Sequence, residues 1–364
     1  MKKNGGGKTG KAPSPKPQAA RLSPLPFLRD TSATAVQPTI SAKAIDQFLK
    51  EHRVKREKIY ARAREIVMEE IKKKGLTDSF YLYDIADVHD RITIWRQFLP
   101  RVELWYAAKV NDDVETFKAL IRRGCGFDVA SVKEFSTVLA LGVDPKKLIF
   151  ANPVKEEYQL EGARKLGVSK MTFDSVEELQ KIKKYYPEAE CVIRLAVDNT
   201  TAVYNLNEKF GVPMKDVPVI LKEGKRLGMR IKGVAFHTGS GGVTIVSYEQ
   251  SLRNARKVFD MAESIGLEPM DFLDLGGGFT LIHAEKIKNF PYVAPLIGKL
   301  LDDLFPSRQV QVIAEPGRYV MESACYLLTR IIGQKVMGDG KRHYYINNGL
   351  YQGYMVKQFG EDMF

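Results

Sequence analysis

The 364-residue chain has no long apolar run and only three cysteines. No stretch approaches the ~20 apolar residues of a membrane-spanning helix, and Lys2 and Lys3 are not followed by the apolar core of a secretory signal. The number of cysteines is odd, and they are widely spaced, at Cys125, Cys191 and Cys325. The sequence contains no Cys-x-x-Cys pair. A disulfide framework and a zinc site are therefore disfavoured, and we expect a chain of the reducing cytoplasm with no membrane anchor.

Acidic residues are absent before Asp30, although the whole chain carries a net charge of +12. Half of that excess lies in the first 28 residues, at Lys2, Lys3, Lys8, Lys11, Lys16 and Arg21. The remaining excess fits solvated helix faces better than a nucleic-acid interface. Residues 1–40 are rich in Gly, Pro, Ser, Ala and Lys and show no periodicity, so we interpret them as a disordered basic extension. An organelle transit peptide is the alternative.

Residues 41–84 are predicted to form helices and a strand that precede the main domain. Ser41 is placed to cap a first helix, a second begins near Arg56, and Gly75 ends it. The segment 79–84 has the apolar and aromatic composition of a strand, and an amphipathic helix follows over 85–99.

From residue 103 onward, short apolar runs alternate with amphipathic stretches eight times. Strands are predicted at 103–108, 126–130, 147–151, 170–173, 191–197, 231–236, 271–275 and 310–314. Helical patterns fill 113–123, 131–141, 155–166, 175–185, 215–227, 246–265 and 289–304. Such alternation indicates parallel strands with right-handed crossovers, and eight units are the number that closes a TIM (β/α)8 barrel. An open doubly wound sheet shares the same local pattern.

Polar or glycine residues follow each of these strands at once, and their placement favours the closed barrel. In a barrel such positions converge on one mouth, whereas in an open sheet they spread along an edge. We therefore predict an α/β chain with a TIM barrel over 85–322. The apolar segments 323–332 and 343–347 would then begin a second, all-β domain over 323–364, which takes in the strand at 79–84 and is incomplete at Phe364.

Lys109 directly follows the first barrel strand. An amine at the end of a buried strand loses hydration, which lowers its pKa and frees it to bond covalently to an aldehyde. Taken alone, a lysine that reaches solvent from a strand end is the more ordinary interpretation.

Three glycine-containing segments are candidates for holding a phosphate group. Gly276–Gly278 follow a strand and let backbone amides approach an anion closely. Ser240 lies in a second glycine loop and offers a hydroxyl donor, and Arg318 beside Gly317 offers a cation. Glycine-rich turns are common, so none of these segments is specific by itself.

His237, Glu315, Asp128 and Arg194 are further titratable or charged groups near strand ends. Glu315 follows the last barrel strand, where a buried carboxylate needs a partner such as a protonated ring nitrogen. For Asp128 and Arg194, a structural ion network is the alternative to a role in a site. Together, an amine, a phosphate cradle, an imidazole and a carboxylate are the parts that hold pyridoxal phosphate.

The chain resembles the fold-type III pyridoxal-phosphate decarboxylases, and within them the eukaryotic-type ornithine decarboxylases. Motifs similar to those of the family occur in family order over about residues 79–354. They are Tyr106-Ala-Ala-Lys-Val-Asn111, Gly126-Phe-Asp-Val-Ala-Ser131, Phe150-Ala-Asn-Pro-Val-Lys155, Phe173-Asp-Ser175, Lys209-Phe-Gly211, Phe236-His-Thr-Gly-Ser-Gly241, Leu273-Asp-Leu-Gly-Gly-Gly-Phe279 and Ala314-Glu-Pro-Gly-Arg-Tyr319.

The resemblance implies a role for each candidate residue. Lys109 holds the cofactor covalently with Asp128 tuning it, His237 stacks on the ring, Glu315 pairs with the ring nitrogen, and Arg194 lies in the same network. The implied cofactor-binding set further comprises Ser240, Gly277, Gly278, Gly317 and Arg318. Tyr351 corresponds to a tyrosine that reaches the partner subunit's site in the family homodimer.

The resemblance further implies a carboxy-lyase of polyamine biosynthesis that converts L-ornithine to putrescine. Asn348 stands where the family has aspartate, Gly360 falls near the family's substrate-binding aspartate, and the chain stops at Phe364, before the family's catalytic cysteine. Arginine and lysine are therefore alternative substrates. A non-catalytic homologue that binds a regulatory protein partner, and a racemase on the same barrel, are the rival functions.

Overall fold

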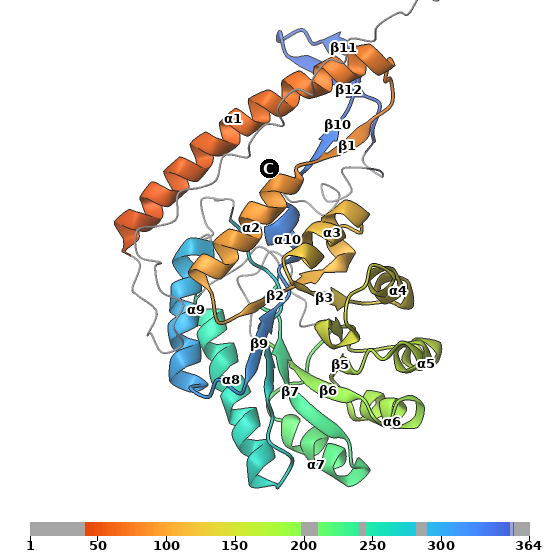
Figure 1. The fold of residues 1–364 in the computed structure, drawn as a ribbon, viewed down its shortest axis with the longest axis vertical. Helices are drawn as coiled ribbons and strands as arrows, with labels where there is room; N and C mark the ends of the chain where they lie inside the picture. The colour runs from red at the N-terminus through yellow and green to blue at the C-terminus, as the bar shows by residue number, and fades with distance from the viewer. Residues whose placement is uncertain (1–40, 198–209, 240–244, 282–289, 350–351, 353–364) are drawn as a thin grey trace, which may run out of the picture.

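The structure is a computed structural model that describes residues 41–197, 210–239, 245–281, 290–349 and 352. Its centre is a closed barrel of eight parallel strands that pair in chain order (Figure 1). The strands are β2 (Glu103–Ala107), β3 (Gly126–Val129), β4 (Leu148–Phe150), β5 (Lys170–Phe173), β6 (Glu190–Leu195), β7 (Arg230–Phe236), β8 (Phe272–Asp274) and β9 (Gln311–Ala314). The predicted TIM-like barrel is therefore confirmed, with each strand end within two residues of its expected place.

Helices cover the outside of the barrel, as the amphipathic stretches predict (Figure 1). They are α3 (Val114–Arg122), α4 (Val132–Ala140), α5 (Glu157–Leu166), α6 (Val176–Tyr185), α7 (Val217–Leu227), α8 (Ile245–Ser264) and α9 (Phe290–Leu304). Polar side chains begin several of them: Asp113 accepts backbone N–H groups at the start of α3, and Ser131 and Ser175 do so for α4 and α6. These N-caps satisfy donors that the first helical turn leaves free.

Two separate hydrophobic cores follow from the alternation of side chains along the strands. One core lies between the strands and the helices, and the other is built from inward-pointing residues of the strands. The second comprises Trp105, Ile149, Ala151, Val192, Ala235, Phe272 and Ile313. Gly126 makes room for Trp105, because a Cβ at this glycine would lie 2.5 Å from the indole ring.

Gly233 on β7 is required by the approach of β8. A Cβ at this position would lie 1.8 Å from the carbonyl oxygen of Phe272, and that oxygen belongs to the backbone and cannot rotate away. We expect Gly233→Ala to lower the free energy of unfolding by about 3 kcal/mol or more, measured by denaturant titration. Gly338→Ala is the control, since nothing lies within 4 Å of its added Cβ. Equal stability of the two variants would contradict the close approach.

Residues 41–74 form one continuous helix, α1 (Ala42–Lys74), so the prediction of two helices is wrong. Ser41 and Gly75 cap its ends as predicted. The two apparent helices reflect a change of environment: Ile45 and Phe48 pack into the main core, whereas Val67 is the buried residue farther along. The apolar stripe therefore shifts although no Gly or Pro interrupts the helix.

Beyond the barrel mouth, the chain forms two small antiparallel sheets. Strand β1 (Phe80–Tyr83) pairs with β10 (Cys325–Leu328), which confirms that the predicted strand at 79–84 joins the segment after residue 323. The predicted strand at 323–332 is split, because β11 (Ile331–Val336) pairs instead with β12 (Arg342–Ile346). Helices α2 (Ile85–Phe98) and α10 (Gly317–Met321) lie between these sheets and the barrel (Figure 1).

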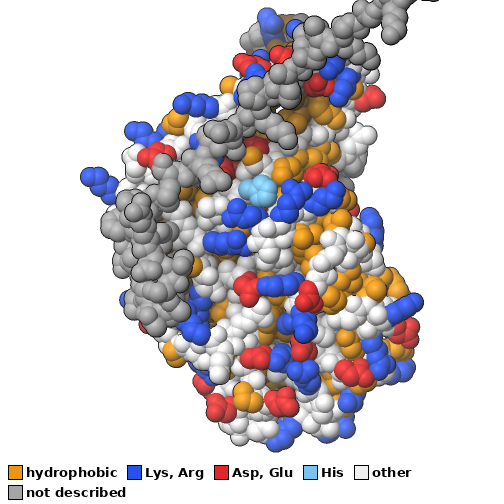
Figure 2. Space-filling view, viewed as in Figure 1, with side chains coloured by type: hydrophobic (Ala, Val, Ile, Leu, Met, Phe, Trp, Pro, Cys, Tyr) orange, Lys and Arg blue, Asp and Glu red, His pale blue; other side chains and the backbone are white. Residues whose placement is uncertain are grey.

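Charged side chains of both signs are interspersed over the face seen in Figure 2. This agrees with the interpretation of the basic excess as solvated helix faces. No helix in the part of the chain that the structure describes is long and apolar enough to cross a membrane. The predicted extension over residues 1–40 lies outside the described residues.

Candidate active site

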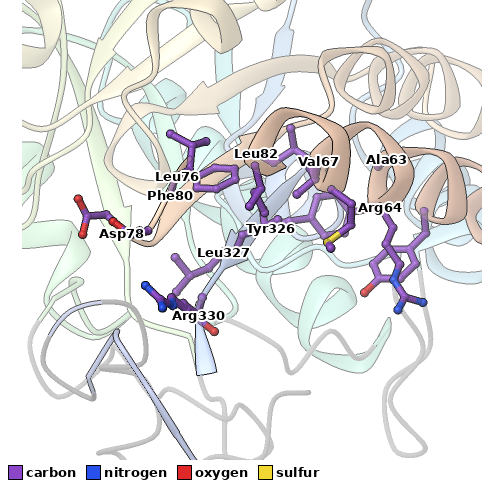
Figure 3. Close-up of a pocket in the computed structure, with 16 residues that line it drawn as sticks. Ala63, Arg64, Val67, Leu76, Asp78, Phe80, Leu82, Tyr326, Leu327 and Arg330 are labelled. Atoms are coloured by element: carbon purple, nitrogen blue, oxygen red, sulfur yellow. The ribbon is translucent and has the colours of Figure 1, made fainter. Parts of the chain in front are cut away.

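Two cavities of similar size lie on the sheet side of the barrel, and one of them contains the predicted reactive lysine. The first, of about 500 Å³, lies between α1, β1 and β10 and is lined mainly by apolar side chains such as Val67, Leu82 and Leu327 (Figure 3). The second, of about 480 Å³, is lined by Lys109, Asn111 and Glu134, among others. The second therefore offers titratable groups beside an amine, so we place the candidate site there and at the adjoining barrel mouth.

The register of the barrel strands brings the predicted residues to one mouth. Ala107 of β2 pairs with Asp128 of β3, and Lys109 follows two residues later in a short 3₁₀ turn (Ala108–Val110). On the far side, Arg194 and Asp274 both pair with Ala235, at neighbouring positions on β6, β7 and β8. Parallel strands end on the same side of a barrel, so residues far apart in sequence meet here.

Lys109 forms an ion pair with Asp128, its Nζ lying 2.8 Å from Oδ2. The Asp128 side chain is 1% exposed, whereas that of Lys109 is 52% exposed. The carboxylates of Asp128 and then Glu315 raise the pKa of Lys109 well above its usual value and outweigh the loss of hydration. The expectation of a lowered lysine pKa is therefore wrong for the chain alone, because the amine has an anionic neighbour and is not fully buried.

His237 and Arg194 lie on the opposite side of the mouth. Burial, together with the positive charges of Arg194 and Lys109, lowers the pKa of His237 to about 3. The imidazole is therefore neutral, and its Nδ1 accepts the N–H of Gly239 at 3.0 Å, which leaves the proton on Nε2. The Arg194 guanidinium lies 5.2 Å from the centre of the Phe210 ring.

The three glycines after β8 allow two loops and the end of β9 to pack against one another. A Cβ at Gly276 would lie 2.3 Å from the Phe236 carbonyl oxygen, and one at Gly278 would lie 2.2 Å from that of Gly239. At Gly277 the added atom would lie 2.8 Å from the Glu315 carbonyl oxygen and 2.9 Å from the His237 Nε2. Gly276 and Gly278 also have φ values of 64° and 98°, in the left-handed region that favours glycine.

Gly317 brings the start of α10 against the turn that carries Lys109. A Cβ at Gly317 would lie 2.4 Å from Val110 Cγ2 and 3.0 Å from Ala107 Cβ. Arg318 follows it directly on α10. The segments that contain the predicted phosphate-binding residues Gly277, Gly278, Gly317 and Arg318 thus surround the mouth beside Lys109.

Glu315 and Asp274 form a buried pair of carboxyl groups that share a hydrogen bond. Asp274 Oδ1 also accepts the Gly276 N–H at 2.8 Å, and the Glu315 N–H donates to the Gly276 carbonyl at 2.7 Å. Burial raises the pKa of Asp274 to about 6, and burial together with Asp128 and Asp274 raises the pKa of Glu315 well above its usual value. Two carboxyls this close share a proton at neutral pH unless a cation joins them.

Residues 85–322 match a family described as "Pyridoxal-dependent decarboxylase, pyridoxal binding domain". The chain belongs to the pyridoxal-dependent decarboxylases. The chain is 37% identical to ornithine decarboxylase of Saccharomyces cerevisiae over 279 residues, which cover 76% of the chain and 59% of the yeast protein. It is 38% identical to antizyme inhibitor 2 of Xenopus laevis over 299 residues, covering 79% of the chain and 65% of the frog protein.

The fold of this decarboxylase-family chain is similar to that of the Paramecium bursaria Chlorella virus arginine decarboxylase. The TM-score is 0.77 at 33% sequence identity, covering 81% of the chain and 79% of the viral chain. The curated relatives are longer proteins, since the chain spans 59% of the yeast decarboxylase and 65% of the frog protein.

The mouth of this pyridoxal-binding domain fits the cofactor that the family name implies. Asp128 Oδ1 is buried and has no hydrogen-bond partner among the described residues. Glu315 and Asp274 are two buried carboxyl groups in contact, and a cationic ring nitrogen would neutralise their negative charge. Close backbone packing at Gly277, Gly278 and Gly317 leaves no room for side chains. The first two observations are those expected of a site for a positively charged ring, and the third shows that the strand-end segments beside it pack closely through their backbones.

Two of the predicted residues lie outside the described residues, and one important group was missed. Ser240 and Tyr351 are not described, and the same holds for Gly360. Asp274 lies in the motif Leu273–Phe279, and an acid in the apolar run Phe272-Leu-Asp-Leu275 is the sequence signal for a buried carboxylate. Its partner could not be named, because the pairing with Glu315 depends on β8 lying beside β9.

The Glu315–Asp274 pair keeps one proton at neutral pH, and the loss of its other proton, near the pKa of Asp274, predicts how the stability of the cofactor-free chain varies with pH. The folded-state pKa of Asp274 rises from the ordinary 3.8 to about 6, so the stability that its proton contributes is present below pH 4 and is lost as the pH rises through 6. Asp274→Asn cannot titrate. We therefore expect the variant to gain about 2 kcal/mol over the wild type between pH 4.5 and pH 8, measured by denaturant unfolding.

A difference between wild type and Asp274→Asn that stays constant over this pH range would contradict the raised pKa of Asp274. Asp302→Asn is the control, because this partly exposed carboxylate is paired with Arg101 at 2.9 Å near the end of α9.

Proposed function

We propose that the chain is the pyridoxal-binding part of a decarboxylase that converts L-ornithine to putrescine and carbon dioxide. The observation that carries the proposal is the placement of the Lys109–Asp128 ion pair and the buried Glu315–Asp274 pair at one barrel mouth, close enough for Glu315 to raise the lysine pKa. The similarity to the yeast ornithine decarboxylase supports the substrate class. Arginine is the alternative substrate, supported by the viral arginine decarboxylase.

When bound, pyridoxal phosphate supplies a ring that accepts the electrons released as carbon dioxide leaves the substrate. In this proposal the Lys109 amine holds the aldehyde carbon, and Asp128 orients that amine. Glu315 would hold a proton on the ring nitrogen, and Asp274 would hold the Glu315 carboxyl in position. The neutral imidazole of His237 would pack against the ring, and Arg194 would balance the acidic side of the mouth.

Gly277, Gly278, Gly317 and Arg318 hold the phosphate in this proposal, together with Ser240. Support comes from their position around the mouth and from the backbone packing that excludes side chains there. A guanidinium such as that of Arg318 suits a phosphate, because its planar fork matches the phosphate oxygens.

We propose further that the protein works in the cytoplasm as a homodimer, with Tyr351 reaching the partner's site. The described cysteines Cys125, Cys191 and Cys325 are free, which suits a reducing compartment. Sheet β11–β12 exposes apolar side chains that a second subunit could cover: Ile331, Ile332, Val336, Tyr344 and Tyr345.

The activity is tested by incubating the purified chain and pyridoxal phosphate with carboxyl-labelled ornithine, arginine and lysine, and trapping the released carbon dioxide. We expect release from ornithine above that from the other two substrates. Release from arginine or lysine instead would change the substrate, and the absence of release from all three would remove the catalytic proposal.

A non-catalytic regulator is the second candidate, because antizyme inhibitor 2 is among the relatives. The residues proposed to hold the cofactor, such as Lys109, Asp128 and Glu315, are present in this chain, which favours the enzyme. The same assay separates the two: cofactor binding without carbon dioxide release from any substrate would favour the regulator.

A further inference from the structure

A buried cluster of charged side chains lies behind the barrel mouth and has no part in the proposed chemistry. Arg91 on α2 is 1% exposed and its Nη1 lies 3.1 Å from Glu322 Oε1. Its guanidinium also donates to Ser323 Oγ, and Ser323 donates to Asp87 Oδ2 at 2.5 Å. Asp87 is balanced by Arg56 of α1 at 2.8 Å. Two cations and two anions thus form a neutral buried network.

Glu322 extends this network to the loop that follows the three glycines. Its Oε2 accepts the Thr280 hydroxyl at 2.6 Å, and its Oε1 accepts the Leu281 N–H at 2.7 Å. The loop therefore contacts a carboxylate whose own position is set by buried Arg91. Each of these bonds involves a charged acceptor, and such bonds are stronger than neutral ones.

Glu322 also directly follows the last residue of α10 in the chain. Its N–H donates to the Arg318 carbonyl at 2.8 Å, and Tyr319 donates its hydroxyl to the Arg91 carbonyl at 3.0 Å. The same residue therefore joins the segment with Gly317 and Arg318 to the loop that begins with Gly276–Gly278. These two segments contain Gly277, Gly278, Gly317 and Arg318, which the proposed function assigns to the cofactor phosphate.

We propose that Glu322 is a positioning residue for the cofactor phosphate: its carboxylate, held by Arg91, sets the distance between the loop 276–281 and the start of α10. The inference rests on the proposed binding of pyridoxal phosphate. Glu322 lies outside the mouth, and in this proposal it affects the affinity for the phosphate group of the cofactor but not the affinity for its pyridine ring.

The test compares pyridoxal phosphate with pyridoxal, which has the same ring and aldehyde but no phosphate. The full chain and its Glu322→Gln variant are titrated with each compound, and the covalent adduct is followed by absorbance. In Glu322→Gln the amide oxygen can still accept bonds at the Oε1 position from Arg91 and Leu281, but the amide nitrogen at the Oε2 position cannot accept the Thr280 hydroxyl, and the negative charge that pairs with Arg91 is removed. We expect the Kd for pyridoxal phosphate to rise about 10-fold, with the Kd for pyridoxal unchanged.

Two further variants separate positioning from general stability. In the double variant Arg91→Met, Glu322→Met both charges are removed together, which preserves a packed interior while Asp87 keeps Arg56; we expect the same loss of phosphate preference. Glu178→Gln is the control, because Glu178 also pairs with a buried cation, Lys155 at 2.9 Å, and its side chain is 2% exposed against 9% for Glu322. This control should lose stability but keep the wild-type ratio of the two Kd values.

Equal losses for pyridoxal phosphate and pyridoxal in Glu322→Gln would overturn the inference, because a structural role would weaken both. Unchanged affinities in Glu322→Gln, or a wild-type ratio in the double variant, would overturn it as well. A wild-type chain that binds neither compound would overturn the proposed function together with the inference.

Discussion

Lys109→Ala is expected to abolish the covalent attachment of pyridoxal phosphate and to lower the rate of decarboxylation by about 1,000-fold or more. The amine is the group at the mouth that can bond to the aldehyde, and the 2.8 Å ion pair with Asp128 fixes its position. Borohydride reduction of the wild-type chain with bound cofactor, followed by peptide mapping, should label Lys109. Reduction of the variant should leave no label.

Lys133→Ala is the matched control, because Lys133 lines the same cavity but is 83% exposed and pairs with Asp112 at 3.6 Å. It should keep both the label and the rate. Lys109→Ala leaves Asp128 buried without its cation, so Lys109→Ala combined with Asp128→Asn guards against simple unfolding. A label on a lysine other than Lys109 would show that the assignment is wrong.

Glu315→Ala is expected to lower kcat at least ~10-fold in a chain that still binds the cofactor. In the proposed site the Glu315 carboxylate would stabilise positive charge on the ring nitrogen, and that charge would matter most when the ring accepts electrons. The loss should therefore fall on kcat more than on KM or on the Kd of the cofactor. Steady-state kinetics at saturating pyridoxal phosphate measure this directly.

Glu315→Gln offers the sharper comparison, because it keeps the size of the side chain and removes its charge. Glu178→Gln is again the control, as a similarly buried carboxyl that pairs with Lys155 after the ends of β4 and β5 and has no part in the proposed cofactor contacts. An unchanged kcat in Glu315→Ala that retains cofactor would falsify the role of this carboxylate.

The order of strands and helices could be read from the sequence, because apolar runs and amphipathic stretches are local patterns. All eight barrel strands lie within two residues of their predicted places. The division of residues 41–74 into two helices failed for a physical reason. The position of the apolar stripe on α1 depends on the neighbours that the helix packs against. These neighbours change from the main core near Phe48 to the cavity beside Val67.

The polar residues at the strand ends could also be predicted, since a charged or glycine residue after a buried strand is a local signal. Their protonation could not. The pKa of Lys109 is raised rather than lowered because Asp128 lies 2.8 Å away, and that distance follows from the pairing of β2 with β3. The role of Glu322 depends in the same way on contacts with α2 and with the loop after β8.

The sequence by itself determined the barrel, the candidate lysine and glutamate, and the resemblance to the pyridoxal-dependent decarboxylases, because each rests on residue type and order along the chain. The tertiary structure alone decided which buried charges meet. Asp274 and Glu315 lie 41 positions apart, as do Leu281 and Glu322, and both pairs form only because the barrel closes with β8 beside β9. Interactions between charges depend on distance and burial in space, and neither is a property of a single segment.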